Sequence, residues 1–435
     1  MPTAPLPEPH VHAAYSIIAA TLSGNRGAEA MLETVIGRLR ADRPGLAFHV
    51  FTYYPEDDRR LVVDDPSINL HSSTPLALVL RLFPLALLFG LLRKLFGAGV
   101  LRHAPADIRG LAESAALVDL AGVAFIDGRE KFLPFNVLTL LPAWLLGTPV
   151  VKMPQATGPY ENGLNRALAS RVLPMCRMLW ARGGRTREHL EAAGFKGLRF
   201  AQADDIAFNH RDAYSLTRDG GPALDARFAE LDALRAAEGA GIIGICPSSV
   251  VAVQSRKSGG NYEQVLSVLV SELLHAGHAV VLFPNATRAA AGDAERNNDI
   301  PVIRRVRDAV GAEGRLLAFD LDMNTVQIKR VIRGMDAVLV SRFHAMVGAL
   351  SLEVPAAVLG WSHKYAEVMA RFGLEDNVMD YKSMSAADLR ASVQRVYEQR
   401  EAMGAAIAAA LPGVKASADR PVAALLTPSL GADLA

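Results

Sequence analysis

The chain has 435 residues, of which 51% are hydrophobic, and this length exceeds what a single hydrophobic core usually supports. Its 46 Lys and Arg residues almost balance its 45 Asp and Glu residues, which excludes a general attraction for nucleic acid. The two cysteines, Cys176 and Cys246, are too few for a disulfide framework or a thiolate zinc site. We therefore expect a two-domain globular protein in a reducing compartment, without a bound metal or cofactor.

The amino-terminal residues 1–10 carry several prolines and no basic flank before an apolar core, so they do not predict a secretory signal. The most apolar segment, residues 76–101, is interrupted by Arg81, Arg93 and Lys94, which argues against a membrane span. It fits either a helix packed on a sheet or a basic-flanked helix in a membrane interface. The expected location is the cytoplasm, with peripheral contact at the inner face of the plasma membrane through this segment as an open alternative.

The chain alternates strand-like and helix-like segments, as parallel sheets covered by helices require. In the first half the expected strands are residues 15–22, 48–53, 116–120, 150–154 and 178–182, with a helix at 27–40. In the second half the expected strands are 241–246, 279–283, 315–318, 337–340 and 356–359, with helices at 262–275, 325–334 and 345–352, and a long last helix at 386–410. Short apolar runs of this kind are typical of strands buried on both faces.

A polar stretch separates the two halves and is expected to connect two domains. The predicted fold is α/β, with two Rossmann-like doubly wound domains facing a central cleft. Residues 1–215 form the first domain, 216–240 the connection and 241–435 the second domain, whose last helix is expected to cross back. Ligands of such domains bind at the carboxyl ends of the strands, in the cleft.

The first strand leads into a glycine-containing turn, Ser23-Gly24-Asn25-Arg26-Gly27-Ala28-Glu29-Ala30. Glycine lets the backbone approach a ligand, and the N–H groups of a helix start favour an anion or sugar hydroxyls. The turn lacks both the dinucleotide spacing and the P-loop lysine. Asn25 and Glu29 are candidate substrate residues, although packing explains such glycines equally well and Glu29 also suits the helix dipole.

Basic residues follow several strands of both halves. Arg182 ends the strand at 178–182, where a guanidinium can hold a phosphate or a carboxylate. In the second half a strand leads directly to Arg342 and His344, which offer an anion anchor and a proton-exchanging group. The next strand is followed by Lys364. Because neighbouring strand ends meet at one sheet edge, we expect His344 and Lys364 to converge on a small dianion or trianion.

Two further strand ends carry polar side chains. Gln155 follows a first-half strand and is a candidate to hydrogen-bond a sugar. Asp204 and Asp205 lie near the domain boundary, where a carboxylate acts either as a base or as the cap of a turn.

Together these motifs resemble the polysaccharide pyruvyl transferases, which have a GT-B-like pair of Rossmann-type domains. The motifs that carry the resemblance are Gly24-Asn25-Arg26-Gly27-Ala28-Glu29-Ala30, Ala181-Arg182, Ala203-Asp204-Asp205-Ile206-Ala207-Phe208, Phe283-Pro284-Asn285, Ser341-Arg342-Phe343-His344-Ala345 and Gly360-Trp361-Ser362-His363-Lys364-Tyr365. The Arg-x-His-Ala element is the most diagnostic. Family members often have Glu after the arginine that corresponds to Arg182, whereas this chain has Gly183.

The resemblance implies an enzyme that transfers a pyruvyl group from phosphoenolpyruvate to sugar hydroxyls and forms a ketal on a surface-polysaccharide precursor. The donor side is implied to be the second domain, with Arg182, Arg342, His344 and Lys364 binding phosphoenolpyruvate. The acceptor, a sugar or a lipid-linked saccharide, is then assigned to the first domain through Gly24, Asn25, Arg26 and Gln155. His344, Asp205 and Glu29 are the candidate catalytic residues.

Two other interpretations fit the same sequence. A nucleotide-sugar glycosyltransferase of the GT-B type would use the same cleft, with the cations binding a diphosphate. A non-catalytic binding protein of this fold is suggested only by the missing Glu after Arg182. The sequence leaves the oligomeric state and the identity of the sugar open.

Overall fold

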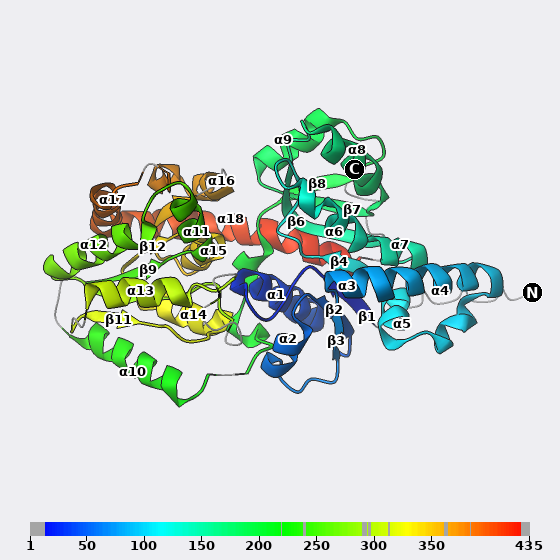
Figure 1. The fold of residues 1–435 in the computed structure, drawn as a ribbon, viewed down its shortest axis with the longest axis horizontal. Helices are drawn as coiled ribbons and strands as arrows, with labels where there is room; N and C mark the ends of the chain where they lie inside the picture. Colours follow the sequence, from blue (N-terminus) through cyan, green and yellow to red (C-terminus); the bar gives the residue numbers. More distant parts are fainter. Residues whose placement is uncertain are drawn as a thin grey trace, which may run out of the picture.

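The computed structural model describes residues 14–218, 220–237, 241–288, 294, 297–311, 314–360, 364–382 and 384–427. These residues form two parallel β-sheets, each covered by helices, which lie side by side in one elongated molecule (Figure 1). The predicted α/β class is confirmed. The strands are short and mostly buried because helices shield both sheets from water.

The first sheet has the strand order β3-β2-β1-β4-β6-β7-β8, with β5 paired to β6. Its strands are β1 (Ala14–Ile18), β2 (Ala47–Thr52), β3 (Ile68–Ser72), β4 (Leu117–Asp119), β5 (Val123–Ile126), β6 (Val150–Gly158), β7 (Met178–Arg182) and β8 (Phe200–Ala203). The strand order reverses between β1 and β4, and in an open α/β sheet such a reversal opens a crevice for ligands.

The second sheet has the order β11-β10-β9-β12-β13-β14, the Rossmann order. Its strands are β9 (Ile242–Cys246), β10 (Ala279–Leu282), β11 (Leu316–Ala318), β12 (Ala337–Val340), β13 (Ala356–Gly360) and β14 (Val378–Asp380). β12 and β13 pair in parallel, so the strand ends that precede His344 and Lys364 are neighbours, as the sequence predicts.

Helices cover the first sheet and project from it at one end. They are α1 (Arg26–Asp42), α2 (Pro55–Leu61), α3 (Pro75–Ala77), α4 (Phe83–Phe96), α5 (Ala106–Glu113), α6 (Leu133–Leu138), α7 (Leu141–Leu146), α8 (Gly163–Val172) and α9 (Gly184–Ala193). One wide turn, η1 (Leu78–Leu82), joins α3 to α4, so that the helical segment is continuous from Pro75 to Phe96. Two short turns also belong to this half: η3 (Glu130–Phe132) lies against α6, and η5 (Ile206–Asn209) lies against α1 and against the helices α15 (Phe343–Ser351) and α18 (Arg400–Leu426) of the second half.

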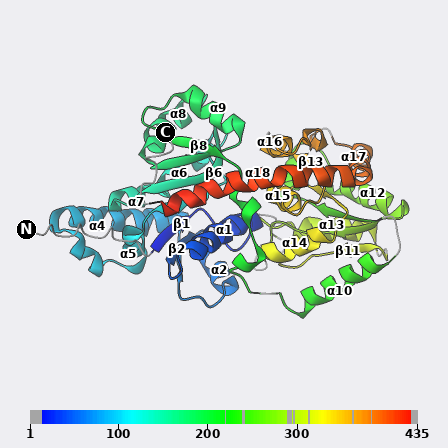
Figure 2. The same cartoon turned by 180° about the vertical axis from the view of Figure 1, so that it is seen from behind.

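The helices of the second half are α10 (Pro222–Ala236), α11 (Ser249–Lys257), α12 (Tyr262–His275), α13 (Ile300–Val310), α14 (Thr325–Arg333), α15 (Phe343–Ser351), α16 (Lys364–Ala370), α17 (Ala386–Glu398) and α18 (Arg400–Leu426). The expected long last helix is two helices that meet at Gln399. α18 runs along both halves (Figure 2), and the Tyr15 hydroxyl in β1 donates to the Leu425 carbonyl at 2.7 Å.

Several strands lack a clear sequence signal because they lie at sheet edges. β3 and β14 contain partly exposed residues, so apolar side chains do not dominate them. The first strand also ends at Ile18 rather than at residue 22, because Ala19 takes a φ of 62° and turns the chain out of the sheet. The segment Trp361-Ser362-His363 of the last predicted strand-end motif lies outside the described residues.

Candidate functional site

A cavity of about 310 Å³ lies where the carboxyl ends of both sheets face each other. Residues after β1 and β4 line one side, and residues after β10, β12 and β13 line the other. Its lining includes Arg182, Arg342, His344 and Lys364, the four residues predicted to bind the donor. Both strand-order reversals therefore open onto one space, which basic side chains of both halves surround.

Arg182 reaches the cavity from the last position of β7. Its guanidinium is almost fully buried, with Nη1 donating to the Asp205 carboxylate at 2.8 Å and Nη2 donating to the Gly122 carbonyl at 2.9 Å. The guanidinium also lies 4.5 Å from the centre of the Phe343 ring, in the other half of the molecule. These contacts fix the orientation of the guanidinium before any ligand arrives.

Asp205 links Arg182 to His344. Its side chain is buried, accepts from the Ala207 backbone N–H at 3.0 Å and lies 3.6 Å from Nε2 of His344. Burial by itself would raise the pKa of Asp205, but the neighbouring His344 and Arg182 hold it well below the usual range. Its contacts with Arg182 and with the Ala207 N–H suit a residue that positions its neighbours. The role of Asp205 as a base stays a prediction.

His344 is pressed against the first turn of α1. A Cβ atom placed on Gly27 would lie only 1.9 Å from Nδ1 and 2.0 Å from Cγ of the imidazole. Any side chain at position 27 would therefore displace His344. The absence of a side chain at Gly27 thus makes room for His344 of the other domain. The sequence suggests a different reason for this glycine, namely the approach of the backbone to a ligand.

Lys364 begins α16, directly after the residues that follow β13. Its ammonium lies 4.7 Å from the centre of the Phe343 ring, so Phe343 contacts both Lys364 and Arg182. Burial, and after it the positive charge of Arg182, lowers the pKa of Lys364 to about 7. A bound anion would reverse both effects, because it would favour the charged ammonium.

Arg342 is held on the opposite wall by the buried carboxylate of Asp299. Its Nε donates to both carboxylate oxygens at 3.0 and 3.1 Å, and its Nη2 donates to the Ser249 hydroxyl at 2.9 Å. Because most of its donors are engaged within the protein, Arg342 adds positive potential to the cavity and shapes it. This arrangement agrees with a supporting role in the pocket.

Three of these four basic residues lie within the part of the chain that a protein-family model matches. The polysaccharide pyruvyl transferase family model matches residues 25–363, which include Asn25, Arg182, Arg342 and His344 and end one residue before Lys364. The chain belongs to this family. Membership supports the transfer of pyruvyl groups to polysaccharide as the general activity of this pyruvyl transferase.

Solved structures share the fold at low sequence identity. A putative UDP-N-acetylglucosamine 2-epimerase from Listeria monocytogenes is 11% identical with a TM-score of 0.58, over 95% of this chain and 96% of that one. Sucrose-phosphate synthase from Thermosynechococcus elongatus is 10% identical with a TM-score of 0.53, over 94% and 96%. The UDP-GlcNAc 2-epimerase from Neisseria meningitidis is 12% identical with a TM-score of 0.52, over 95% and 99%. The predicted GT-B-like architecture is confirmed.

Glu29 and Arg26 of the pyruvyl transferase do not face the cavity. Glu29 is completely buried and accepts from the Thr217 hydroxyl and from the backbone and hydroxyl of Thr325. Arg26 is buried among Thr287, Asp322 and Glu29. Both contradict the predicted roles, since neither a catalytic Glu29 nor an acceptor-binding Arg26 is accessible. They join α1 to the second sheet's loops instead.

Of the remaining predicted acceptor residues, the structure brings only Asn25 to the cavity. Asn25 lines its wall and caps α1 by accepting from the Gly27 N–H at 3.1 Å. The Gly24 N–H donates to the Thr287 carbonyl at 2.9 Å across the two halves. Gln155 is fully buried in β6 and donates to the Met153 carbonyl at 3.4 Å. The predicted contacts of Gly24 and Gln155 with the acceptor are therefore contradicted by their positions.

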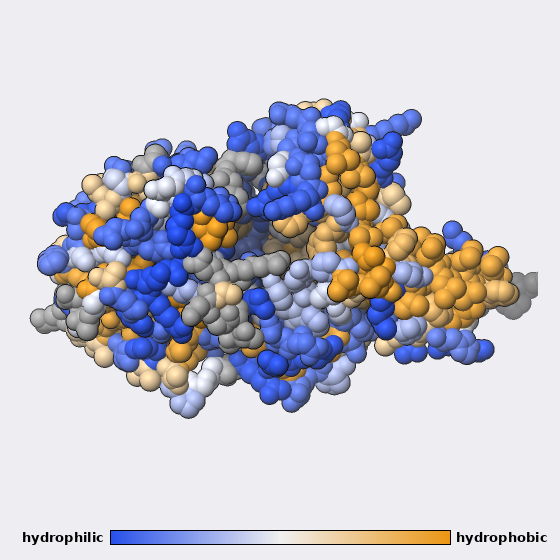
Figure 3. Space-filling model, viewed as in Figure 1, coloured by the Kyte–Doolittle hydropathy of each residue, from blue (hydrophilic) through white to orange (hydrophobic). Residues whose placement is uncertain are grey.

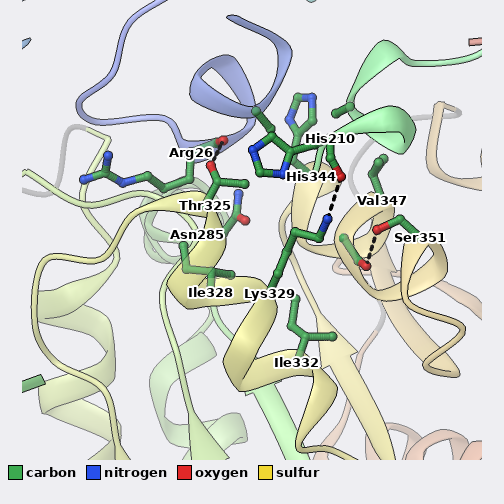
Figure 4. Close-up of a pocket in the computed structure, with 13 residues that line it drawn as sticks. Arg26, His210, Asn285, Thr325, Ile328, Lys329, Ile332, His344, Val347 and Ser351 are labelled. Atoms are coloured by element: carbon green, nitrogen blue, oxygen red, sulfur yellow. Dashed lines mark hydrogen bonds between the residues drawn. The ribbon is translucent and has the colours of Figure 1, made fainter. Parts of the chain in front are cut away.

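A second, much smaller cavity of about 20 Å³ lies behind His344, between α1, α14 and α15 (Figure 4). Its polar lining includes His210, Asn285 and Lys329, whose ammonium donates to the His210 carbonyl at 2.9 Å. This buried contact helps to hold α14 against the loop that carries Asp205. His344 and Asn285 line both cavities, so this packing lies directly behind the larger one.

The lining residues to which sequence reasoning assigned no role include Ala19, Arg129, Phe343 and Asn297. Arg129 follows a strand that has no clear sequence signal, and Phe343 reads as an ordinary apolar residue of a helix start. Ala19 and Asn297 have positive φ angles of 62° and 53°. Such conformations are costly for residues other than glycine and gather at functional sites, but they leave no mark in the sequence.

The missing carboxylate after Arg182 has a counterpart in the second half. Gly183 has a φ of 87°, and a Cβ there would lie 2.9 Å from Oε1 of Glu367 in α16. The same oxygen accepts from the Arg185 backbone N–H at 2.7 Å. The protein therefore places the Glu367 carboxylate of the other half beside this strand end.

Proposed function

We propose that the protein transfers the pyruvyl group of phosphoenolpyruvate to two hydroxyls of a sugar and forms a cyclic pyruvate ketal on a surface-polysaccharide precursor. The observation that supports this best is the convergence of Arg182, His344 and Lys364 on one cavity of about 310 Å³ between the sheets. Family membership supports the pyruvyl group as the group transferred, and the basic side chains of the cavity favour a small, highly charged donor.

Phosphoenolpyruvate suits this cavity because it carries a phosphate and a carboxylate on a three-carbon frame. Arg182 and Lys364 both contact the Phe343 ring, so two positive groups are held close together at the carboxyl ends of β7 and β13. We assign them to the anionic groups of the donor, with Arg342 adding positive potential. No metal ion is needed in this scheme.

The reaction requires one proton addition, two proton losses and one leaving group. A proton adds to the methylene carbon of phosphoenolpyruvate and leaves positive charge on the neighbouring C2 carbon. One sugar hydroxyl adds to C2 and loses its proton; a second hydroxyl then forms a bond to C2, loses its proton and displaces phosphate as the C2–O bond breaks. The products are a ketal and inorganic phosphate, which takes the remaining proton.

His344 is the proposed proton donor or phosphate partner in this reaction. The buried Asp205 carboxylate lies 3.6 Å from its Nε2 and would stabilise the protonated imidazole. Asp205 therefore positions His344 and Arg182 together rather than acting on a ligand itself. Asn25, at the border of the cavity, is the one predicted acceptor residue that this proposal retains.

Donor competition tests the proposal directly. The protein is incubated with a saccharide acceptor and either phosphoenolpyruvate or a set of nucleotide sugars, and the release of phosphate or nucleoside diphosphate is followed. We expect phosphate release only from phosphoenolpyruvate and only with acceptor present, together with a ketal in the product. Sugar transfer from a nucleotide donor would establish the glycosyltransferase alternative, and failure of all donors to react would favour a binding protein.

A further inference from the structure

The helical segment from Pro75 to Phe96 carries an apolar stripe that the rest of the protein leaves uncovered. Leu76, Leu80, Leu87, Leu91 and Leu95 recur at intervals of four or seven residues and therefore lie on one face, and each is at least half exposed. Among the described residues this is the one helix long and apolar enough to cross a membrane, although only 28% of its most apolar stretch is buried. Figure 3 shows this apolar surface on the projecting end of the molecule.

The opposite face of the same segment is built into the first domain. Leu78, Leu82 and Ala86 are buried, and a Cβ on Gly90 would lie 2.3 Å from the Leu145 carbonyl of α7. Such close packing fixes the segment along its length. The uncovered stripe is therefore presented sideways, which suits a helix lying in the plane of a membrane surface rather than one that spans it.

Charge around the stripe favours an anionic partner. Residues 75–101 contain no Asp or Glu, and Lys94 and Arg102 are exposed near the end of the segment. Lys131 is exposed beside the exposed ring of Phe132 in η3. An apolar stripe edged by basic side chains matches a bilayer that carries anionic lipid, whereas a purely apolar protein partner would not require the basic edge.

A large cavity lies between the start of this helical segment and the cation-lined cavity. It has a volume of about 650 Å³, and its walls include Pro75, Leu78 and Val79 of the helical segment and Phe132 and Phe135 of the adjoining turn and helix. The two cavities share Ala19, Asn25 and Arg129 in their walls. The two cavities therefore adjoin each other, between the helical segment and the predicted donor residues.

We propose that the segment Pro75–Phe96 and Phe132 form a membrane-docking surface for an anionic bilayer face, and that the acceptor is a lipid-linked saccharide which enters through the larger cavity. The acceptor part rests on the proposed function; the docking part does not. Docking would bring the lipid-proximal end of the acceptor to the apolar walls, while its sugar reaches Asn25 and the cation-lined cavity.

Vesicle co-sedimentation tests the docking surface without any turnover. The full chain is mixed with phosphatidylcholine vesicles or with vesicles of phosphatidylcholine and phosphatidylglycerol. We expect preferential binding to the anionic vesicles and a loss of about tenfold or more in the Leu80→Glu/Leu87→Glu/Leu91→Glu variant, because charge on the apolar face opposes insertion. The matched control Leu164→Glu/Met175→Glu/Val268→Glu alters exposed apolar residues elsewhere and should bind like the wild type.

Three results would overturn the docking surface. These are an unchanged sedimentation of the triple variant, equal loss in the control, or no binding of the wild type to either vesicle. If the triple variant instead converts a dimer to a monomer in light scattering and vesicle binding is absent, the stripe is an interface between copies of the chain. The Lys94→Glu/Arg102→Glu variant leaves the apolar face intact and should lose the preference for anionic vesicles. Because it changes other residues, it tests the docking surface even if the triple variant fails to fold.

Turnover separates the acceptor proposal from the proposed function. With vesicles present, the triple variant should lose most turnover of a lipid-linked saccharide but keep wild-type turnover of a water-soluble acceptor fragment. Equal turnover of the lipid-linked acceptor by variant and wild type would overturn the acceptor proposal alone. No ketal formation by the wild type on either acceptor would overturn the proposed function and leave the vesicle result standing.

Discussion

The two adjoining cavities of this protein are built from opposite kinds of residue. The smaller one gathers Arg182, His344, Arg342 and Lys364 from both sheets, whereas aromatic and aliphatic side chains dominate the walls of the larger one. In the smaller cavity, buried carboxylates hold the cations: Asp205 for Arg182 and Asp299 for Arg342. A charged ligand thus needs cations that the protein holds in place beforehand, whereas an apolar ligand needs only an apolar wall of the right shape.

The charged cavity depends on the contact between the two halves, and the apolar cavity depends far less on it. Arg182 and His344 come from different sheets and meet through Asp205. The apolar cavity is formed almost wholly by the first half, with Asn297 as its contribution from the second. Changes at the interface should therefore damage donor chemistry more than acceptor entry.

The largest expected effect is the loss of His344. His344→Ala should lower kcat by about 10²–10⁴-fold, because a group that donates a proton or contacts phosphate is removed at the reacting centre. The measurement is phosphate release from phosphoenolpyruvate with saturating acceptor. His275→Ala, an exposed histidine in α12, is the control and should be silent. Wild-type turnover by His344→Ala would remove this residue from the reaction.

A methyl group at position 27 should act on the same histidine from the other half. Gly27→Ala is expected to lower kcat by roughly 10–100-fold and the free energy of unfolding by about 1–3 kcal/mol, because the new Cβ overlaps the imidazole of His344. Gly413→Ala is the matched control, since its Cβ meets nothing and the change suits the interior of α18. Unchanged kinetics in Gly27→Ala would show that His344 does not need this position.

Donor affinity should depend on pH through Lys364. With a pKa lowered to about 7, the ammonium is charged below that pH and neutral above it, so affinity for phosphoenolpyruvate should fall by up to about tenfold per pH unit above pH 7. Isothermal titration at several pH values measures this slope. Lys364→Arg should flatten it, because arginine stays charged. An equally steep slope in that variant would assign the dependence to another group.

The smallest expected effect concerns the apolar cavity. Phe135→Ala should raise the KM for acceptor by roughly fivefold, equivalent to about 1 kcal/mol of lost apolar contact, and leave the affinity for phosphoenolpyruvate unchanged. Leu164→Ala, an exposed residue in α8, serves as the control for general effects of truncation. A change in donor affinity of similar size would show that the two cavities do not act separately.

Much of the fold and part of the site could be predicted from the sequence. The alternation of apolar runs located most strands, and strand-end reasoning placed Arg182, His344 and Lys364 in one cleft, where the structure also has them. Edge strands such as β3 were not predicted, because their residues are only partly buried and apolar side chains do not dominate them. The positions of Arg129, Ala19 and Asn297 in the cavity wall were not predicted, because they depend on neighbours that are distant in the sequence.

The same glycine turn shows where sequence reasoning stops. Gly24, Asn25, Arg26 and Glu29 lie within six residues of one another, yet of these four only Asn25 lines the cavity. A helix turns by about 100° per residue, so neighbours point in different directions. Which direction meets a ligand and which meets the other domain depends on how the two domains pack, which the local sequence does not encode.

The sequence by itself determined the α/β architecture with two sheets and the basic strand ends that surround the predicted donor, because apolar periodicity and strand-end chemistry are local properties, and its motifs carried the resemblance to the family. The tertiary structure alone decided that Asp205 lies between Arg182 and His344, that Glu29 and Arg26 join the two halves, and that the apolar helix borders a cavity beside the site. Burial and orientation arise only when distant segments pack together, and they set which polar groups can meet a substrate.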